Sequence, residues 1–148
     1  MMSAIRTILL AEDSPADAEM AIDALREANL ANPIVHVEDG VEAMEYLQRR
    51  GRFADRPDEE PVVLLLDIKM PRMDGLEVLR RIRADERLRR LPVVILSSSR
   101  EESDLVRSWD LGANAYVVKP VDVGQFFGAV KTLGRFWAVI NEIPGGEG

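Results

Sequence analysis

The chain has 148 residues, a length suited to one domain with one sizeable core. It contains no cysteine and one histidine, which excludes a disulfide framework and a Cys-based metal site and argues against a multi-histidine zinc site. The formal net charge of −7 argues against nonspecific binding to DNA or RNA. The apolar run near the start is too short for a membrane span and lacks a signal-peptide cleavage site, so we expect a cytoplasmic protein.

Short apolar runs alternate with helical patterns along the chain. Residues 7–11 predict a buried strand, and Ser14 and Pro15 suit the N-cap and the first position of a following helix, with Asp17 at the capping-box position. The charged segment 51–61 has no period and predicts an exposed loop. The other predicted elements are strands at 33–37, 62–66, 92–97 and 115–119 and helices at 39–50, 75–91, 101–112 and about 122–141.

The strand–helix unit repeats five times. Continuous Val, Ile and Leu runs indicate strands buried on both faces, which is typical of a parallel sheet covered by helices. Right-handed crossovers between parallel strands then give an open, doubly wound α/β sheet with helices on both faces. We therefore expect one domain over residues 1–148.

Charged and hydroxyl side chains collect where the predicted strands end. Glu12 and Asp13 follow the first strand, Asp67 the third, Ser97 ends the fourth and Lys119 the fifth. In open α/β sheets the carboxyl ends of the strands form the binding edge. Two carboxylates about 4 Å apart repel by roughly 4 kcal/mol at an effective dielectric of about 20, so a hard divalent cation such as Mg²⁺ suits this all-oxygen group. The alternative for the acidic pair is a favourable contact with the dipole of the next helix.

Asp67 is a candidate covalent nucleophile, because a carboxylate can accept a phosphoryl group. That chemistry needs a cation on the far side of the group and a hydroxyl for a remaining oxygen, and Lys119 and Ser97 are the right residue types on adjacent strand ends. Individually, Lys119 also fits an ordinary exposed lysine, and Ser97 a hydroxyl that bonds local backbone. These separate alternatives leave their shared edge unexplained.

Four motifs occur in order along the chain: "LLAEDS", "LLLDIKMPRMDG", "VVILSSS" and "AYVVKP". Together they closely resemble the receiver domain of bacterial two-component response regulators, over roughly residues 5–130. The resemblance implies a flavodoxin-like, five-stranded parallel sheet of strand order 2-1-3-4-5. It also implies a signalling switch rather than an enzyme, with self-phosphotransfer from a phosphohistidine and autodephosphorylation, whose output is a protein contact.

The resemblance assigns roles residue by residue. Asp67 corresponds to the phosphoryl acceptor, and Ser97, Lys119 and Tyr116 correspond to the catalytic and switch residues. Mg²⁺, with Mn²⁺ as the substitute, would be bound by Asp13, Asp67 and the backbone carbonyl of Lys69, and through water by Glu12. Glu12 stands where Asp is commoner. The phosphoryl donor would be a sensor histidine kinase or a phosphotransfer protein, and His36 is interpreted as a half-buried or surface histidine.

A narrower resemblance involves the long loop at 49–61 and the ending "AVKTLGRFWAVINEIP". Both are similar to the stand-alone response regulators that partner bacterial phytochrome histidine kinases. We therefore expect a stand-alone regulator with a phytochrome-type kinase as a possible partner, and no binding to nucleic acid or membrane.

The last predicted helix carries two apolar stripes, whereas a helix that covers a domain needs one. Exposing four large side chains of the second stripe would forgo roughly 6 to 12 kcal/mol of burial. We expect a receiver core at about 5–130 and a helical extension at about 131–143 that forms a homodimer, unless this end folds back over its own domain. The candidate interface residues are Phe127, Phe136, Trp137, Val139, Ile140 and Ile143.

Three other functions fit the sequence less well. Haloacid-dehalogenase-like phosphatases need a second aspartate two residues after the nucleophile, where this chain has Lys69, and a cap segment that it lacks. A nucleotide or flavin site needs a glycine- or hydroxyl-rich phosphate loop, but "AEDSPADA" has no glycine. A degenerate receiver that acts only as a binding module is disfavoured by the complete residue set.

Overall fold

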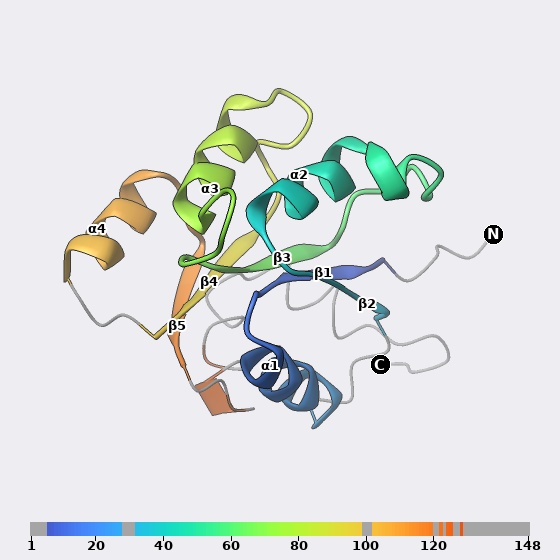
Figure 1. The fold of residues 1–148 in the computed structure, drawn as a ribbon. Helices are drawn as coiled ribbons and strands as arrows, with labels where there is room; N and C mark the ends of the chain where they lie inside the picture. The colour runs from blue at the N-terminus through green and yellow to red at the C-terminus, as the bar shows by residue number, and fades with distance from the viewer. Residues whose placement is uncertain are drawn as a thin grey trace, which may run out of the picture.

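The computed structural model describes residues 6–27, 32–98 and 102–119 and positions 122, 124, 125 and 128. Its elements alternate strand and helix, as the sequence predicts (Figure 1). In chain order they are β1 Ile8–Ala11, α1 Pro15–Glu27, β2 Ile34–Val37, α2 Gly40–Gln48, the 3₁₀ helix η1 Gly51–Phe53, β3 Val63–Asp67, α3 Gly75–Ala84, β4 Val93–Ser97, α4 Glu102–Asp110 and β5 Ala115–Val118.

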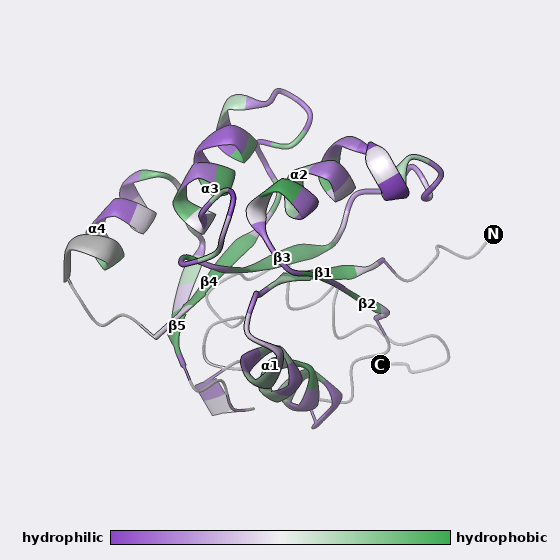
Figure 2. Ribbon diagram, viewed as in Figure 1, coloured by the Kyte–Doolittle hydropathy of each residue, from purple (hydrophilic) through white to green (hydrophobic). Residues whose placement is uncertain are grey.

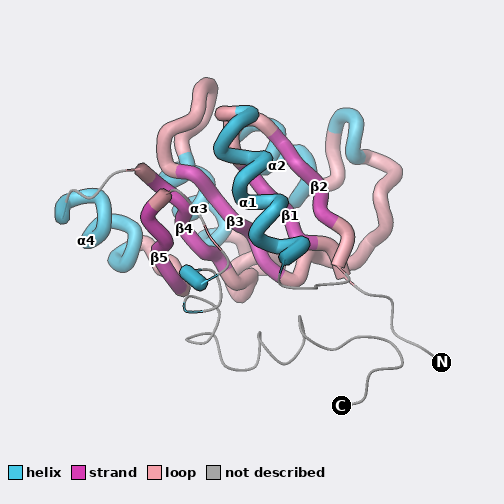
Figure 3. The backbone as a smooth tube through the Cα atoms, turned by 90° about the horizontal axis from the view of Figure 1, so that it is seen from below, coloured by secondary structure: helices cyan, strands magenta, loops and turns pink. Residues whose placement is uncertain are grey.

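The five strands form one parallel sheet of order β2-β1-β3-β4-β5, which confirms the predicted topology. Helix α1 covers one face, and α2 and α3 cover the other (Figure 1). The view from below places α1 in front of the strands (Figure 3). Because all strands run the same way, their carboxyl ends share one edge of the sheet, which we call the rim.

Successive strand residues face opposite layers and build two cores. Leu9 and Leu64 pack with residues of α2 and α3, whereas Ile8, Leu10 and Leu65 pack with α1. Figure 2 shows the resulting apolar sheet between helices whose outer surfaces are polar. Since strands buried on both faces need apolar residues at every position, the unbroken Val, Ile and Leu runs are explained.

Two helices end earlier than the sequence suggests. Helix α2 stops at Gln48, because Arg49 adopts a left-handed conformation with φ of 56°. Helix α3 was predicted to reach Leu91 but stops at Ala84. There, Asp85 turns to extended backbone, and its Oδ1 accepts hydrogen bonds from the amides of Arg87 and Leu88 at 2.8 and 3.2 Å. Aspartate commonly ends helices in this way, since its side chain competes for nearby backbone donors.

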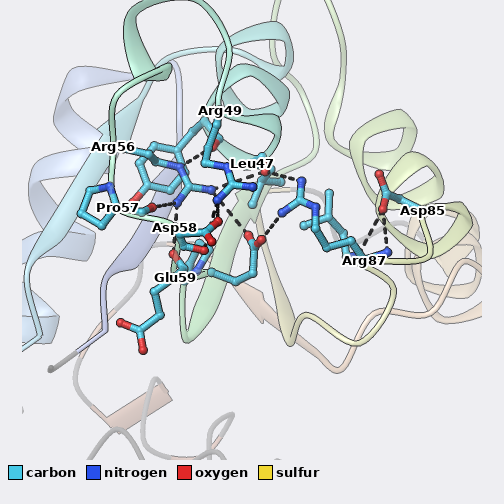
Figure 4. A network of polar contacts seen from close by, with 12 residues as sticks. Leu47, Arg49, Arg56, Pro57, Asp58, Glu59, Asp85 and Arg87 are labelled. Carbon is cyan, nitrogen blue, oxygen red and sulfur yellow. Dashed lines mark hydrogen bonds and ion pairs between the residues drawn. The ribbon is translucent and has the colours of Figure 1, made fainter. Parts of the chain in front are cut away.

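The segment predicted as an exposed loop is mostly exposed; it contains the 3₁₀ helix η1 and is anchored by arginines (Figure 4). Arg56 donates to the carbonyl oxygens of Tyr46, Pro57 and Glu59 at 2.6, 2.7 and 3.0 Å, and its guanidinium lies 4.3 Å from the centroid of the Tyr46 ring. Arg87 donates to the carbonyl oxygen of Leu47 at 2.8 Å. These guanidinium groups bond carbonyls in the last turn of α2, where helical partners run out; the Tyr46 carbonyl also accepts from the Arg49 amide at 3.3 Å.

The predicted C-terminal helix lies outside the described residues, apart from isolated positions near its start. All six candidate dimer residues, Phe127 to Ile143, are outside that part as well. Within the described part, no helix is both long and apolar enough to span a membrane.

Candidate functional site at the strand carboxyl ends

Glu12 is fixed at the end of β1 by the neighbouring strand. Its amide donates to the carbonyl of Val37 at 3.0 Å, and Nε2 of the half-buried His36 donates to its carbonyl at 2.8 Å. The Glu12 carboxylate is buried, and its Oε2 accepts a hydrogen bond from the amide of Ser14 at 3.1 Å. His36 is therefore a half-buried structural contact, as the sequence suggests.

Asp67 is the last residue of β3 and is only 4% exposed. The chain turns back closely behind it, because the amide of Gly75 donates to the carbonyl of Ile68 at 2.7 Å. A Cβ atom at Gly75 would lie 2.1 Å from the Asp67 carbonyl oxygen, so only glycine fits without a shift. Asp74 then caps α3 through a 2.9 Å hydrogen bond from the Glu77 amide.

Lys119 links three elements through its ammonium group. Its amide donates to the carbonyl of Ser97 at 2.8 Å, which fixes the lysine beside β4. Nζ lies 2.6 Å from Glu12 Oε1, 3.0 Å from Asp17 Oδ2 and 3.4 Å from Asp67 Oδ1. Because its side chain is 9% exposed, the ammonium is held among carboxylates with little access to water.

The cluster of acidic residues has the composition of a hard-cation site. One carboxylate oxygen each from Glu12, Asp13 and Asp67 lies within 4.8 Å of the other two. Asp13 is exposed, whereas the other two are buried, so one side opens to solvent. All-oxygen donors with room for water suit Mg²⁺, and Lys69 follows two residues after Asp67. The donor set therefore fits the metal predicted from the sequence.

The crowding of carboxylates changes how Asp67 binds a proton. Burial and then the neighbouring Glu12 carboxylate raise the pKa of Asp67 to about 7, against the opposing effect of Lys119. Burial alone would lower the pKa of Lys119, but its contacts with Glu12, Asp17 and Asp67 raise it overall. In the metal-free protein, Lys119 is thus a firmly charged group that only partly offsets the repulsion between carboxylates.

The two other predicted switch residues lie on β4 and β5. Ser97 is buried at the end of β4, the strand that pairs with β3, so its hydroxyl belongs to the same rim as Asp67. Tyr116 lies on β5 opposite Ile95 and is half-buried against the core that contains α2 and α3. The structure therefore brings together Glu12, Asp13, Asp67 and Lys119. Tyr116 lies within β5, the edge strand that pairs with β4.

Two contacts were missed by the sequence interpretation. Asp17 was expected only to cap its own helix, but its carboxylate reaches Lys119. The sequence did contain a signal for this contact, since Asp17 lies in the first turn after β1, at the rim.

The second contact is made by Arg72, whose φ is 67°. It donates to Asp39 Oδ2 at 2.9 Å, while Asp39 Oδ1 caps α2. Burial alone would raise the pKa of Asp39, but the hydrogen bonds from the Glu42 amide and from Arg72 lower it overall.

Taken together, the sheet order and the carboxylate–lysine rim define a flavodoxin-like α/β protein with an acidic site whose donor set suits a hard cation. The model of the response regulator receiver domain matches residues 8–131. The chain therefore belongs to the response regulator receiver family, and its function is in two-component phosphorelay signal transduction.

The relatives include proteins named as phytochrome or bacteriophytochrome response regulators. The response regulator Rcp1 of Synechocystis sp. is 34% identical over 139 residues, covering 94% of this chain and 93% of Rcp1. The bacteriophytochrome response regulator AtBRR is 52% identical with a TM-score of 0.86, covering 95% of this chain and 100% of that chain. The phosphorylated cyanobacterial phytochrome response regulator RcpA is 40% identical with a TM-score of 0.76, covering 91% and 95%.

Proposed function

We propose that Asp67 is the phosphoryl acceptor of this receiver domain and that the donor is a phosphohistidine on a sensor kinase or phosphotransfer protein. The observation that carries the proposal is the placement of Asp67 within reach of Lys119 and within 4.8 Å of two further carboxylates. A buried carboxylate with a facing ammonium and a cation site is the arrangement that phosphoryl transfer requires.

The chain's own residues would act mainly by position and charge. An Asp67 carboxylate oxygen attacks phosphorus in line, so the O–P bond forms as the N–P bond to histidine breaks. The released imidazole keeps the electron pair and takes up a proton. Lys119 would pair with an equatorial phosphoryl oxygen, and the Ser97 hydroxyl would donate to another, both from strand ends that are already fixed.

Glu12, Asp13, Asp67 and the carbonyl of Lys69 would hold the divalent cation. When bound, the cation offsets the mutual repulsion of the carboxylates, keeps Asp67 ionised near neutral pH and screens the incoming phosphoryl charge. Mn²⁺ is the expected substitute, and a matched structure of Rcp1 is described as its Mn²⁺-bound form.

Several finer features belong to the same proposal. The phytochrome response regulators among the matched structures support a phytochrome-type kinase as the partner. Autodephosphorylation and output through a protein contact, with Tyr116 as the aromatic switch, follow from the receiver function. A single domain with its core at about 5–130, a homodimer through the extension at 131–143, the absence of nucleic-acid binding and a cytoplasmic location remain predictions of the sequence.

The test is intact-mass measurement after incubation with Mg²⁺ and acetyl phosphate or phosphoramidate. Wild-type protein should gain one phosphoryl group, and Asp67→Asn should gain none. A second arm supplies an autophosphorylated bacterial phytochrome kinase, which should transfer faster than a kinase of another sensory class. Wild type that stays unmodified with every donor, or an Asp67→Asn variant labelled as well as wild type, would overturn the assignment.

A further inference from the structure

Asp17 makes a contact that the receiver assignment leaves unexplained. Its Oδ2 accepts a hydrogen bond from Lys119 Nζ at 3.0 Å, joining the first turn of α1 to the end of β5. The same ammonium lies 3.4 Å from Asp67, so the contact with Asp17 is shorter than the contact with the proposed acceptor. In the form described here, Lys119 is thus shared with a carboxylate that lies outside the cation cluster.

The local structure of α1 frees Asp17 for this contact. In a capping box, the acidic residue at this position would accept the N-cap amide hydrogen. Here Ser14 Oγ accepts from the Asp17 amide at 3.2 Å, but the Ser14 amide donates to Glu12 Oε2 at 3.1 Å. Because Glu12 takes the amide hydrogen that Asp17 would receive, the Asp17 carboxylate is available to Lys119.

We propose that Asp17 is a positioning residue that holds Lys119 in the unphosphorylated state and competes with the phosphoryl group for its ammonium. The proposal rests on Asp67 as the acceptor. A phosphoryl group on Asp67 adds oxygens beyond the carboxylate, and Lys119 must loosen one existing contact to reach them.

Exposure decides which contact is released. Glu12 is 1% exposed, so losing its ammonium partner would leave a buried carboxylate without its counter-charge. The Asp17 side chain is 36% exposed, and water can solvate its carboxylate when Lys119 leaves. Asp17 is therefore the partner that yields, and its negative charge also opposes the arrival of a phosphoryl dianion.

Removing the Asp17 charge should consequently favour the phosphorylated form. Trifluoroberyllate, a stable phosphoryl mimic, is titrated in saturating Mg²⁺ and its bound fraction is measured by ¹⁹F NMR. We expect Asp17→Asn to bind it about two- to fivefold more tightly than wild type, the range for a partly exposed ion pair. Glu19→Gln removes one charge from an exposed position of the same helix and should leave the affinity unchanged. Equal or weaker binding by Asp17→Asn would overturn the proposal.

A metal-free measurement separates this contact from the phosphorylation chemistry. Urea unfolding in EDTA is compared for Asp17→Asn, Lys119→Gln and the double variant. Asp17→Asn should lower the urea midpoint further when Lys119 is present than in the Lys119→Gln background, because the contact of Asp17 with the α1 dipole is lost in both. An equal loss in the two backgrounds would overturn the proposal. If wild type binds no trifluoroberyllate, the acceptor assignment fails and the competition fails with it, while this cycle still reports whether Asp17 holds Lys119.

Discussion

Replacing Asp67 with asparagine should stabilise the metal-free protein at alkaline pH. Asp67 is 4% exposed, and burial and the adjacent Glu12 raise its pKa from 3.8 to about 7. A shift of about three units corresponds to roughly 4 kcal/mol of differential stability between the protonated and ionised forms. Asparagine has nearly the same shape and cannot ionise, so it avoids this cost.

The sign follows from proton binding in the two states. Between the unfolded pKa of 3.8 and the folded pKa of about 7, native Asp67 binds more protons than unfolded Asp67. The Asp67 contribution to the free energy of unfolding therefore falls as pH rises through this window and is constant outside it. Since the asparagine amide accepts a weaker hydrogen bond from Lys119, we expect a net gain of about 2 to 4 kcal/mol at pH 8.

The assay is urea unfolding followed by circular dichroism in EDTA, at intervals from pH 4.5 to 8.5. The stability gap between Asp67→Asn and wild type should be near zero at the acid end and grow toward pH 8. Asp23→Asn, which removes an exposed charge from α1, controls for net charge and should show no such growth. Excess Mg²⁺ should close the gap, because it binds and stabilises wild type by about 2.7 kcal/mol at a hundred times its Kd. A gap that is independent of pH, or a less stable variant at pH 8, would refute the reasoning.

Two substitutions test how the site and its surroundings are held. Gly75→Ala places a Cβ 2.1 Å from the Asp67 carbonyl oxygen. It should lower the free energy of unfolding in urea by more than about 2 kcal/mol and weaken Mg²⁺ binding. The control Gly128→Ala adds a Cβ that meets no atom within 4 Å and should be neutral. Arg56→Met removes the guanidinium that donates to the carbonyls of Tyr46 and Leu47 at the end of α2 and should lower the free energy of unfolding by about 2 to 4 kcal/mol. The control Arg90→Met, at an exposed position, should change it little. Equal effects of the two substitutions would contradict the anchoring role.

The sequence by itself determined the layers and the rim. Strands buried on both faces need unbroken apolar runs, so "VVLLL" and "PVVILS" predicted the strands that the structure has as β3 and β4. Because parallel strands have their carboxyl ends at one edge of the sheet, the sequence alone predicts that Glu12, Asp67 and Lys119 lie together there. The order of the strands came from the family resemblance, since periodicity alone does not rank neighbours in a sheet.

Only the tertiary structure decided which of these charges contact one another. The end of α3 depends on Asp85 bonding two amides rather than continuing the helix, a competition that helical periodicity does not register. Asp17 and Lys119 are 102 residues apart, and their pairing occurs together with the hydrogen bond from the Ser14 amide to Glu12. Local sequence rules place each residue on a helix or strand. The contacts of a buried ammonium depend instead on all the carboxylates that the fold brings close to it.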